Sequence, residues 1–296
     1  MKVGICFPMT MQAPRQRNVF LDWCKAVDRS GLSTIALGER IAYHAQDPLI
    51  ALAAACGVTE RVRLMTSVAV LPLRNTGLLA KELSTLDILS GGRFVFGVGI
   101  GNRPGDFSAL DAQWSGRAHR METQIKALRS IWRGEGLADG VPPIGPAPLS
   151  RGGPPVIYGA MSDVALRRAG HVADGVITWS MRPDATVQMA SIRTVEQAWR
   201  ESGRSGRPYI VAAMYFSLGA GAEEMLKSHL AAYYSYSQEA RARIADVRTY
   251  TAAAVAETMK SYADAGVDEL LFGPPTASTD QIGYLAEIAS RLGYSA

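Results

Sequence analysis

The stretch LSGGRFVFGVGIGNRPGDF, residues 89–107, contains the pattern that decides the fold. Its Gly-Gly pair at 91–92 can adopt positive φ, which is how many helices end. The run FVFGV that follows is rich in β-branched and aromatic residues, as expected of a buried parallel strand. The stretch therefore predicts a helix, a tight turn and a buried strand in succession.

Glycines and polar residues gather where this strand ends. Three glycines alternate along it: Gly97, Gly99 and Gly101. Glycine within a strand often marks a close approach of the backbone to another group, and polar residues at strand ends often carry function. Asn102, Arg103 and Asp106 follow at once. We interpret this end of the strand as the floor of a ligand site.

Working outward, short apolar runs alternate with amphipathic helices along the whole chain. The expected strands are 3–8, 33–37, 62–70, 94–98, 155–159, 175–179, 209–218 and 268–273. Eight such pairs in 296 residues predict an α/β fold, a single (β/α)8 TIM barrel forming one domain over 1–296. A lone G-x-G after FVFGV does not complete a dinucleotide fingerprint, which disfavours an open Rossmann sheet.

Two segments interrupt the alternation, and we treat them as insertions at about 134–155 and 218–250. The first is loop-like in composition and connects a helix to the next strand, so we expect it at the amino-terminal face of the barrel. The second follows the seventh strand and contains the aromatic run HLAAYYSYSQEAR. It could cover the barrel mouth as a lid, with Tyr233, Tyr234 or Tyr236 contributing, or form an ordinary packed helix pair.

Composition limits the class of protein. The net charge of +4 is spread over scattered arginines without a basic run, so we expect no nucleic-acid binding. No apolar run is long enough to span a bilayer and no signal peptide is recognisable, so we expect a cytoplasmic protein without membrane association. Three cysteines without CxxC spacing are expected to be reduced, and the four histidines predict no metal site.

Three segments resemble the bacterial luciferase-like monooxygenase superfamily, whose members bind FMN or the deazaflavin F420. Residues 47–110, from DPLIALAAACGVTER to GNRPGDFSAL, are similar to its central signature. The run PPVIYGAMSDVALRRAGHVADGVITW at 154–179 resembles its second signature, and AGVDELLFG at 265–273 its eighth-strand motif. The resemblance implies a TIM barrel with F420 or FMN at the mouth formed by the strand carboxyl ends.

The resemblance also implies cofactor contacts. The turn GAMSD matches the family's phosphate-binding turn, and the start of a helix there suits an anion, although Ser162 alone would also suit a plain helix cap. A non-prolyl cis peptide would fall near Ser67-Val68, where the alternative is an ordinary strand end. Asn102 would hydrogen-bond the ring edge or the cofactor side chain. The expected cofactor-binding residues are Phe7, Ser67, Val68, Asn102, Gly159, Ala160, Met161, Ser162 and Trp179.

The loop after the second strand departs from the family pattern. Many relatives have an acidic residue followed by histidine, whereas this chain has Glu39 followed by Arg40. Arginine orients anions well but is a poor proton shuttle, and His44 in the same loop could substitute. We expect Glu39, Arg40 and His44 to be catalytic, with Glu39 holding the Arg40 guanidinium. The alternative is a salt bridge on the rim.

Three functions follow from the resemblance. The first is F420-dependent hydride transfer to or from a small organic substrate. The second is an FMN monooxygenase that receives reduced flavin from a separate reductase, and the third is a barrel that binds flavin without catalysis. A Schiff-base aldolase is disfavoured, because none of the six lysines lies clearly at a strand's carboxyl end. We expect a small-molecule substrate, a flavin or F420 reductase as partner, and a homo-oligomer.

Overall fold

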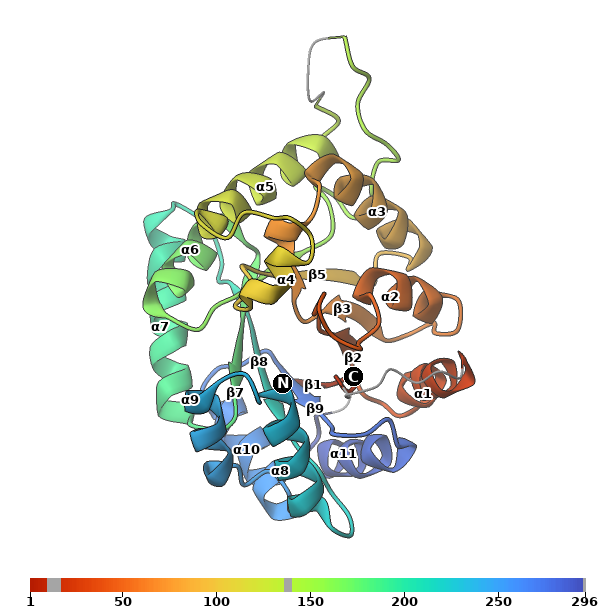
Figure 1. Ribbon diagram of the computed structural model, residues 1–296, viewed down its shortest axis with the longest axis vertical. Coiled ribbons are helices and arrows are strands. Elements are labelled where there is room, and N and C mark those ends of the chain that lie inside the picture. Colours follow the sequence, from red (N-terminus) through yellow and green to blue (C-terminus); the bar gives the residue numbers. More distant parts are fainter. Residues whose placement is uncertain (10–16, 136–139, 295–296) are drawn as a thin grey trace.

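A closed ring of parallel strands lies at the centre of the computed structural model, which describes residues 1–9, 17–135 and 140–294 (Figure 1). The sheet order is β3-β2-β1-β9-β8-β7-β6-β5-β4, and β3 also pairs with β5, which closes the ring. The strands are β1 (Lys2–Cys6), β2 (Thr34–Leu37), β3 (Arg63–Thr66), β4 (Ala69–Val70), β5 (Phe94–Gly99), β6 (Val156–Gly159), β7 (Gly175–Ser180), β8 (Tyr209–Tyr215) and β9 (Glu269–Gly273). Since β3 and β4 occupy one position between β2 and β5, the predicted eight-stranded TIM barrel is confirmed.

Helices surround the strands and connect most of them in sequence (Figure 1). They are α1 (Arg17–Arg29), α2 (Pro48–Cys56), η1 (Leu71–Leu73), α3 (Thr76–Leu89), α4 (Pro104–Ser108), α5 (Arg117–Trp132), α6 (Asp163–Val172), α7 (Ala185–Glu201), α8 (Ala222–Tyr233), α9 (Gln238–Ala242), η2 (Arg243–Asp246), α10 (Ala252–Asp264) and α11 (Thr279–Arg291). The start of α2 is as the sequence predicts, with Asp47 as the N-cap and Pro48 first in the helix.

Side chains alternate between two layers of core. Along β1, Val3 and Ile5 belong to the large cluster between strands and helices, whereas Cys6 joins a smaller cluster inside the barrel with residues such as Met65 and Ile177. This alternation is the period of two that a strand imposes on its side chains. It explains why the strands read as continuous apolar runs, because both of their faces are buried.

A polar network closes the amino-terminal end of the barrel. Glu269, at the start of β9, is 1% exposed and forms an ion pair with Arg63 at the start of β3. Ser33 Oγ donates to Glu269 Oε1 at 2.6 Å, and Arg63 also donates to the hydroxyl of Tyr209 at 2.8 Å. Burial acts to lower the pKa of Arg63, but the adjacent Glu269 carboxylate outweighs it and raises that pKa. The charges at this end are therefore matched.

The two insertions differ in structure. The described part of the first, 140–155, is irregular and extends away from the barrel beyond α5, whereas residues 136–139 lie outside the described range (Figure 1). Asp87 of α3 holds it by accepting from the backbone N–H of Ser150 at 2.7 Å and from its Oγ at 2.8 Å. The second contains α8, α9 and η2, so helix dominates it.

Two local features differ from the prediction. The third strand does not run continuously over 62–70, because it breaks between β3 and β4 at Ser67 and Val68. The short helix α4 follows β5, where the sequence predicts only a polar strand end. Its five residues are too few for a helical period of apolar positions to be visible.

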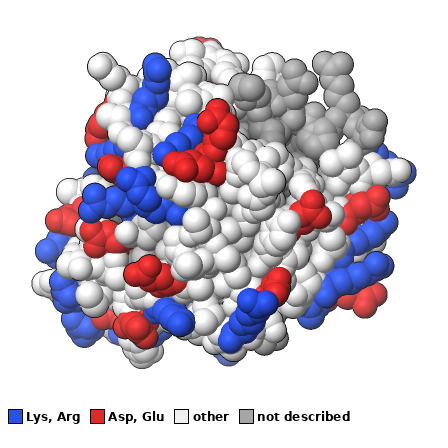
Figure 2. Space-filling model, turned by 90° about the horizontal axis from the view of Figure 1, so that it is seen from below, with Lys and Arg blue, Asp and Glu red and all other residues white. Residues whose placement is uncertain are grey.

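Positive and negative side chains are mixed on the one face of the surface that Figure 2 shows. On the face drawn in Figure 2, Lys and Arg side chains are interspersed with Asp and Glu and do not form one basic stripe. Within 1–9, 17–135 and 140–294, no helix combines the length and the apolar character needed to cross a membrane.

Candidate active site

The carboxyl ends of the parallel strands open on one end of the barrel, which we call the mouth. In a barrel of this kind the loops that leave these ends carry ligand-binding and catalytic residues. Here the loops after β2, β5, β6 and β8 supply most of the predicted site residues. The mouth therefore brings most of the predicted site residues to one end of the barrel.

The break between β3 and β4 contains the non-prolyl cis peptide Ser67-Val68 that the family resemblance implies. The Val68 side chain lies against two of the glycines that line the mouth. A Cβ added to Gly99 would lie 2.7 Å from Val68 Cγ2, and one added to Gly159 would lie 3.4 Å from Val68 Cγ1. Val68 is half-buried and packs against the cluster inside the barrel.

The glycines in and after FVFGV mark a close approach of the backbone, as the sequence predicts, and the groups that they approach are other parts of the protein. A Cβ on Gly97 would lie 1.9 Å from the carbonyl oxygen of Thr66, and one on Gly101 would lie 2.7 Å from Val70 Cγ1 and 2.9 Å from the ring of Phe107. The space beside these glycines is thus filled by β3, β4 and α4. The glycines thus allow a close approach of the backbone to neighbouring protein, and the ligand floor at this end of the strand stays a prediction.

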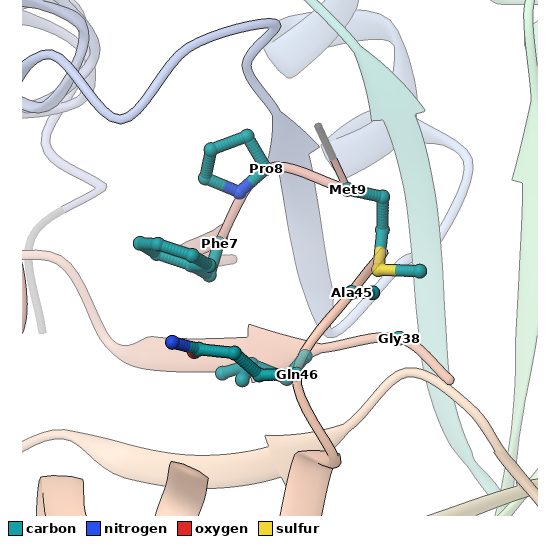
Figure 3. Close-up of a pocket in the computed structure, with 7 residues that line it drawn as sticks. Phe7, Pro8, Met9, Gly38, Ala45 and Gln46 are labelled. Carbon is teal, nitrogen blue, oxygen red and sulfur yellow. The ribbon is translucent and has the colours of Figure 1, made fainter. Parts of the chain in front are cut away.

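A small hollow lies on the β1–β2 side of the mouth. Figure 3 shows Phe7 and Pro8 after β1 lying across it from Gln46 and Ala45 of the β2–α2 loop. Its volume of about 10 Å³ has room for one water at most. The Phe7 ring packs edge-on against Phe20 and Trp23 of α1, with centroids 4.9 and 5.1 Å apart. Phe7 therefore belongs mainly to the layer between barrel and helices.

The turn from β6 into α6 is open, as a phosphate site would have to be. Met161 is 71% exposed and Ser162 is also exposed, whereas Ala160 is buried and donates its N–H to the carbonyl of Ile177 at 3.0 Å. Ser162 is the N-cap of α6, and its Oγ accepts from the N–H of Ala165 at 3.4 Å. The first turn of a helix offers backbone N–H groups and a positive dipole end to an anion.

Asn102 and Trp179 lie at two other points on the mouth. Asn102 is exposed between β5 and α4. Trp179, near the end of β7, is half-buried, and its ring centroid lies 5.1 Å from that of Tyr215 on β8. Its backbone N–H donates to the sulfur of Met161 at 3.3 Å, which links the end of β7 to the turn before α6.

Glu39 forms an ion pair that the sequence did not predict. Its carboxylate pairs with Arg74, at the end of η1, and accepts from the backbone N–H of Val70 at 2.6 Å. Burial raises the pKa of Glu39, while the Arg74 charge opposes that shift. No ion pair joins Glu39 to Arg40 in the described structure, so the expected contact between them was wrong. Arg74 also pairs with Asp47 at 3.0 Å, which ties the β2 loop to α2.

Arg40 lies among aromatic rings instead. Its guanidinium carbon is 4.0 Å from the ring centroid of Tyr43, 5.4 Å from that of Tyr233 and 5.9 Å from that of Tyr236. Burial, followed by the positive charge of Arg103, lowers the pKa of Arg40. His44 is exposed, with its ring 6.0 Å from that of Tyr43. The three predicted catalytic residues thus share a loop but point to different partners.

The segment 222–236 reaches across the mouth, and we call it the cover. Tyr233 meets Tyr43 of the β2 loop edge-on, with centroids 5.8 Å apart, and Tyr234 exchanges a hydroxyl hydrogen bond of 2.9 Å with Tyr215. Leu226 and Leu230 of α8 are buried in a cluster with Tyr215. The predicted position over the mouth is confirmed, whereas its mobility stays a prediction.

Sequence reasoning did not identify two residues of the site, Arg74 and Tyr43. It also assigned no role to Arg103, which meets the cover. Arg103 is named at the mouth by its place after β5, but nothing local indicates that it meets Tyr233 and Tyr236. Within the described ranges, no cluster of three His, Cys, Asp or Glu side chains could hold a metal ion.

A TIM barrel with an open helix start and a covered, polar mouth has the architecture of a small-molecule enzyme. The chain belongs to the luciferase-like monooxygenase family, whose model matches residues 1–292. Members of this family are flavin- or F420-dependent oxidoreductases and monooxygenases.

The chain is also similar to a protein of known sequence and shares its fold with solved structures. An uncharacterised protein of Mycobacterium tuberculosis is 28% identical over 255 residues, which cover 83% of this chain and 76% of the relative. An F420-dependent secondary alcohol dehydrogenase in complex with an F420-acetone adduct shares the fold with a TM-score of 0.79, 17% identity and coverage of 97% and 98%. The monooxygenase RslO1 from Streptomyces bottropensis does so with a TM-score of 0.75, 18% identity and coverage of 98% of both chains.

Proposed function

We propose that this protein is an F420-dependent oxidoreductase that transfers a hydride to or from a small organic substrate. The observation that carries the proposal is the open turn at residues 159–162, which leads into the ten-residue helix α6 at the mouth. That turn has the exposure and the helix dipole needed to bind a cofactor phosphate. The family membership and the F420-dependent enzymes among the structural neighbours support the choice of cofactor.

The residues at the mouth fit a flavin-type group in chemical character. Ser67 Oγ is buried without a hydrogen-bond partner among the described residues, and the adjoining Val68 offers an apolar surface to a ring. The exposed amide of Asn102 could bond a ring edge, and Trp179 adds an aromatic wall. The bound cofactor would supply the hydride chemistry itself, and the protein would orient it and exclude water.

The phosphate turn, Arg40, Glu39 and the cover then each have a defined task, whereas no contact in the described structure gives His44 or Phe7 one. The turn at 159–162 binds the phosphate, and the Arg40 guanidinium keeps a fixed positive charge near the reacting groups. Glu39 acts through Arg74 and the N–H of Val70, so it positions β4 and the β2 loop and does not touch substrate. The aromatic side chains of the cover exclude water from the mouth.

An FMN monooxygenase is the second candidate. Monooxygenases among the structural neighbours share the fold, and a mouth closed by tyrosines would protect oxygen chemistry as well as hydride transfer. This candidate, like the first when F420 serves as reductant, needs a separate reductase to supply reduced cofactor. A barrel that binds flavin without catalysis is the remaining alternative, and it predicts binding without turnover.

Separate titrations of the purified protein with F420 and FMN, followed by ring fluorescence, test the proposal. We expect F420 to bind with a Kd well below 1 mM and more tightly than FMN. Met161→Glu would place a negative charge in the phosphate turn and weaken binding at least tenfold, or about 1.4 kcal/mol. Val187→Glu, at an exposed position of α7, is the matched control and should leave binding unchanged. Failure of both cofactors to bind below about 1 mM would contradict the proposal.

A further inference from the structure

Two arginines from different loops converge at the mouth. Arg40 follows β2 and Arg103 follows β5, and these strands flank the β3–β4 position of the barrel. The guanidinium carbon of Arg103 lies 4.9 Å from the ring centroid of Tyr233 and 4.3 Å from that of Tyr236. Arg40 lies within 6 Å of the same two rings. Two positive charges therefore share one aromatic surface.

Neither of these arginines has a carboxylate partner within the part of the chain that the structure describes. No ion pair of 4.0 Å or less involves Arg40 or Arg103, although Arg63 and Arg74 are both paired. Asp106 is an acidic neighbour whose charge acts to raise the pKa of Arg40, but it forms no ion pair with Arg40, and its Oδ1 accepts from the N–H of Ala42 at 2.8 Å. Two adjacent like charges are unfavourable unless something compensates them.

Three buried donor groups at this place also lack hydrogen-bond partners among the described residues: Arg40 Nε, Arg103 Nε and the Tyr43 hydroxyl. A buried polar group without a partner costs free energy, and its presence in a folded protein calls for an explanation. Donors gathered in this way, two of them guanidinium forks, match the planar oxygens of a carboxylate or the oxygens of a phosphate.

The geometry points to an oxyanion-binding site formed by Arg40, Arg103 and Tyr43, which takes the acidic group of an anionic substrate. This inference rests on the proposed function, because it names the substrate class of the same mouth. The cover completes the site, since Tyr233 and Tyr236 belong to it and stack on both guanidinium groups. A bound anion would therefore also hold the cover in place.

The acidic groups of the cofactor are the competing source of an oxyanion, and position argues against them. The cofactor phosphate is assigned to the turn at 159–162 after β6, whereas Arg40 and Arg103 follow β2 and β5. Arg103 meets Tyr233 of the cover, which also meets Tyr43 of the β2 loop, and β2 and β6 lie on opposite sides of β5 in the barrel. The substrate side of the mouth is thus the better match.

Calorimetric titration of inorganic phosphate and of propionate onto the full protein, without cofactor, tests the site. We expect at least one anion to bind and its affinity to fall at least tenfold in Arg40→Gln and in Arg103→Gln. Arg103→Lys keeps the positive charge but loses the two-pronged guanidinium, so its affinity for the anion should lie between that of the glutamine variants and that of the unaltered protein. Arg200→Gln, exposed on α7, removes the same charge elsewhere and should have no effect. Absence of anion binding, or equal affinity in all variants, would overturn the inference.

Fluorescence titration with F420 and FMN in the same variants separates the two sources. We expect cofactor affinity to change less than threefold in Arg40→Gln and Arg103→Gln. A loss of tenfold or more would mean that the arginines bind the cofactor, which would overturn the substrate assignment while leaving the proposed function standing. If the unaltered protein binds a cofactor but binds neither phosphate nor propionate, the oxyanion site is overturned and the proposed function stands.

Discussion

The two ends of the barrel differ in how completely their buried charges are paired. At the amino-terminal end, Arg63 and Glu269 are paired and bonded to Ser33 and Tyr209. At the mouth, Glu39 is paired with Arg74, but Arg40 and Arg103 lie on tyrosine rings and pair with no described carboxylate. Matched charges hold strands together, whereas charges left unmatched at a mouth are available to a ligand. The difference separates the stabilising end of this molecule from its functional end, as in other TIM barrels.

The largest effect is expected from breaking the matched end. Glu269→Gln would leave the Arg63 guanidinium without its counter-charge, and we expect a loss of about 3–5 kcal/mol in the free energy of unfolding. Urea denaturation measures this loss. Glu287→Gln, which removes an exposed carboxylate paired with Arg291, should cost under about 0.5 kcal/mol. A loss below about 1 kcal/mol for Glu269→Gln would show that the network contributes little.

A substitution of an unpaired arginine at the mouth should change turnover more than it changes stability. Arg40→Ala is expected to lower turnover roughly 10- to 1000-fold, about 1.4–4 kcal/mol in activation free energy, because a fixed charge beside the reacting groups is lost. Its unfolding free energy should change by no more than about 2 kcal/mol, the scale of cation–π contacts that are shielded from water. Steady-state kinetics and urea denaturation on one preparation check both values. Normal turnover in a normally folded variant would show that Arg40 has a structural role only.

The cover should make stability depend on pH. Burial lowers the pKa of His229 to about 4, against about 6.5 in the unfolded chain. As the pH falls, the unfolded state therefore binds a proton at His229 before the folded state does. The stability that the neutral, buried imidazole contributes is complete above about pH 6.5 and is lost towards pH 4. We expect the free energy of unfolding to fall by about 2 kcal/mol over this range on account of His229, because its side chain is half-buried and keeps part of its hydration.

Urea denaturation between pH 4 and 7 measures the effect of His229. His229→Gln should flatten the dependence by that amount, whereas His119→Gln, exposed on α5, should not. The same slope in the His229 variant and the unaltered protein would mean that the imidazole is not shielded by Tyr215 and Tyr233, whose rings lie 6.2 and 6.3 Å away.

The smallest effect should appear at two helix caps. Asp47 Oδ1 accepts from the N–H groups of Leu49 and Ile50 at 2.9 and 3.0 Å, whereas the Ser162 bond is 3.4 Å long. We therefore expect Asp47→Ala to cost about 1 kcal/mol and Ser162→Ala clearly less. Thermal unfolding compares them. An equal or larger loss at Ser162 would assign the turn before α6 to stability, as a plain helix cap.

Most of the fold could be predicted from the sequence because its signals are local. Apolar runs bounded by glycine and proline give the strands, and Asp47 with Pro48 gives the start of α2. The break between β3 and β4 has no such signal, since TSVAV is rich in β-formers throughout. The helix α4 is too short to show a period. The family resemblance, and not the residue pattern, indicated the cis peptide at Ser67-Val68.

The position of the site at the mouth could be predicted from the sequence, but the contacts between its side chains could not. The rule that strand carboxyl ends carry function brought Glu39, Arg40 and Arg103 to the mouth. The partner of Glu39 is 35 residues away at Arg74, and the rings on Arg103 come from a helix after β8. Contacts across such separations depend on the closed barrel and leave no trace in local spacing. The close contacts of Gly97, Gly99 and Gly101 could not be assigned from the sequence for the same reason, because their neighbours include residues of β3, β4 and the break between them.

Hydrogen exchange with and without saturating F420, repeated with FMN, tests most directly whether the mouth is the cofactor site. We expect slower exchange at the backbone N–H groups of 162–166 in the first turn of α6 and in the cover at 222–236. Exchange at the starts of β3 and β9, in the matched end, should not change. Unchanged exchange at the start of α6 with bound cofactor, or protection at the amino-terminal end, would contradict this assignment.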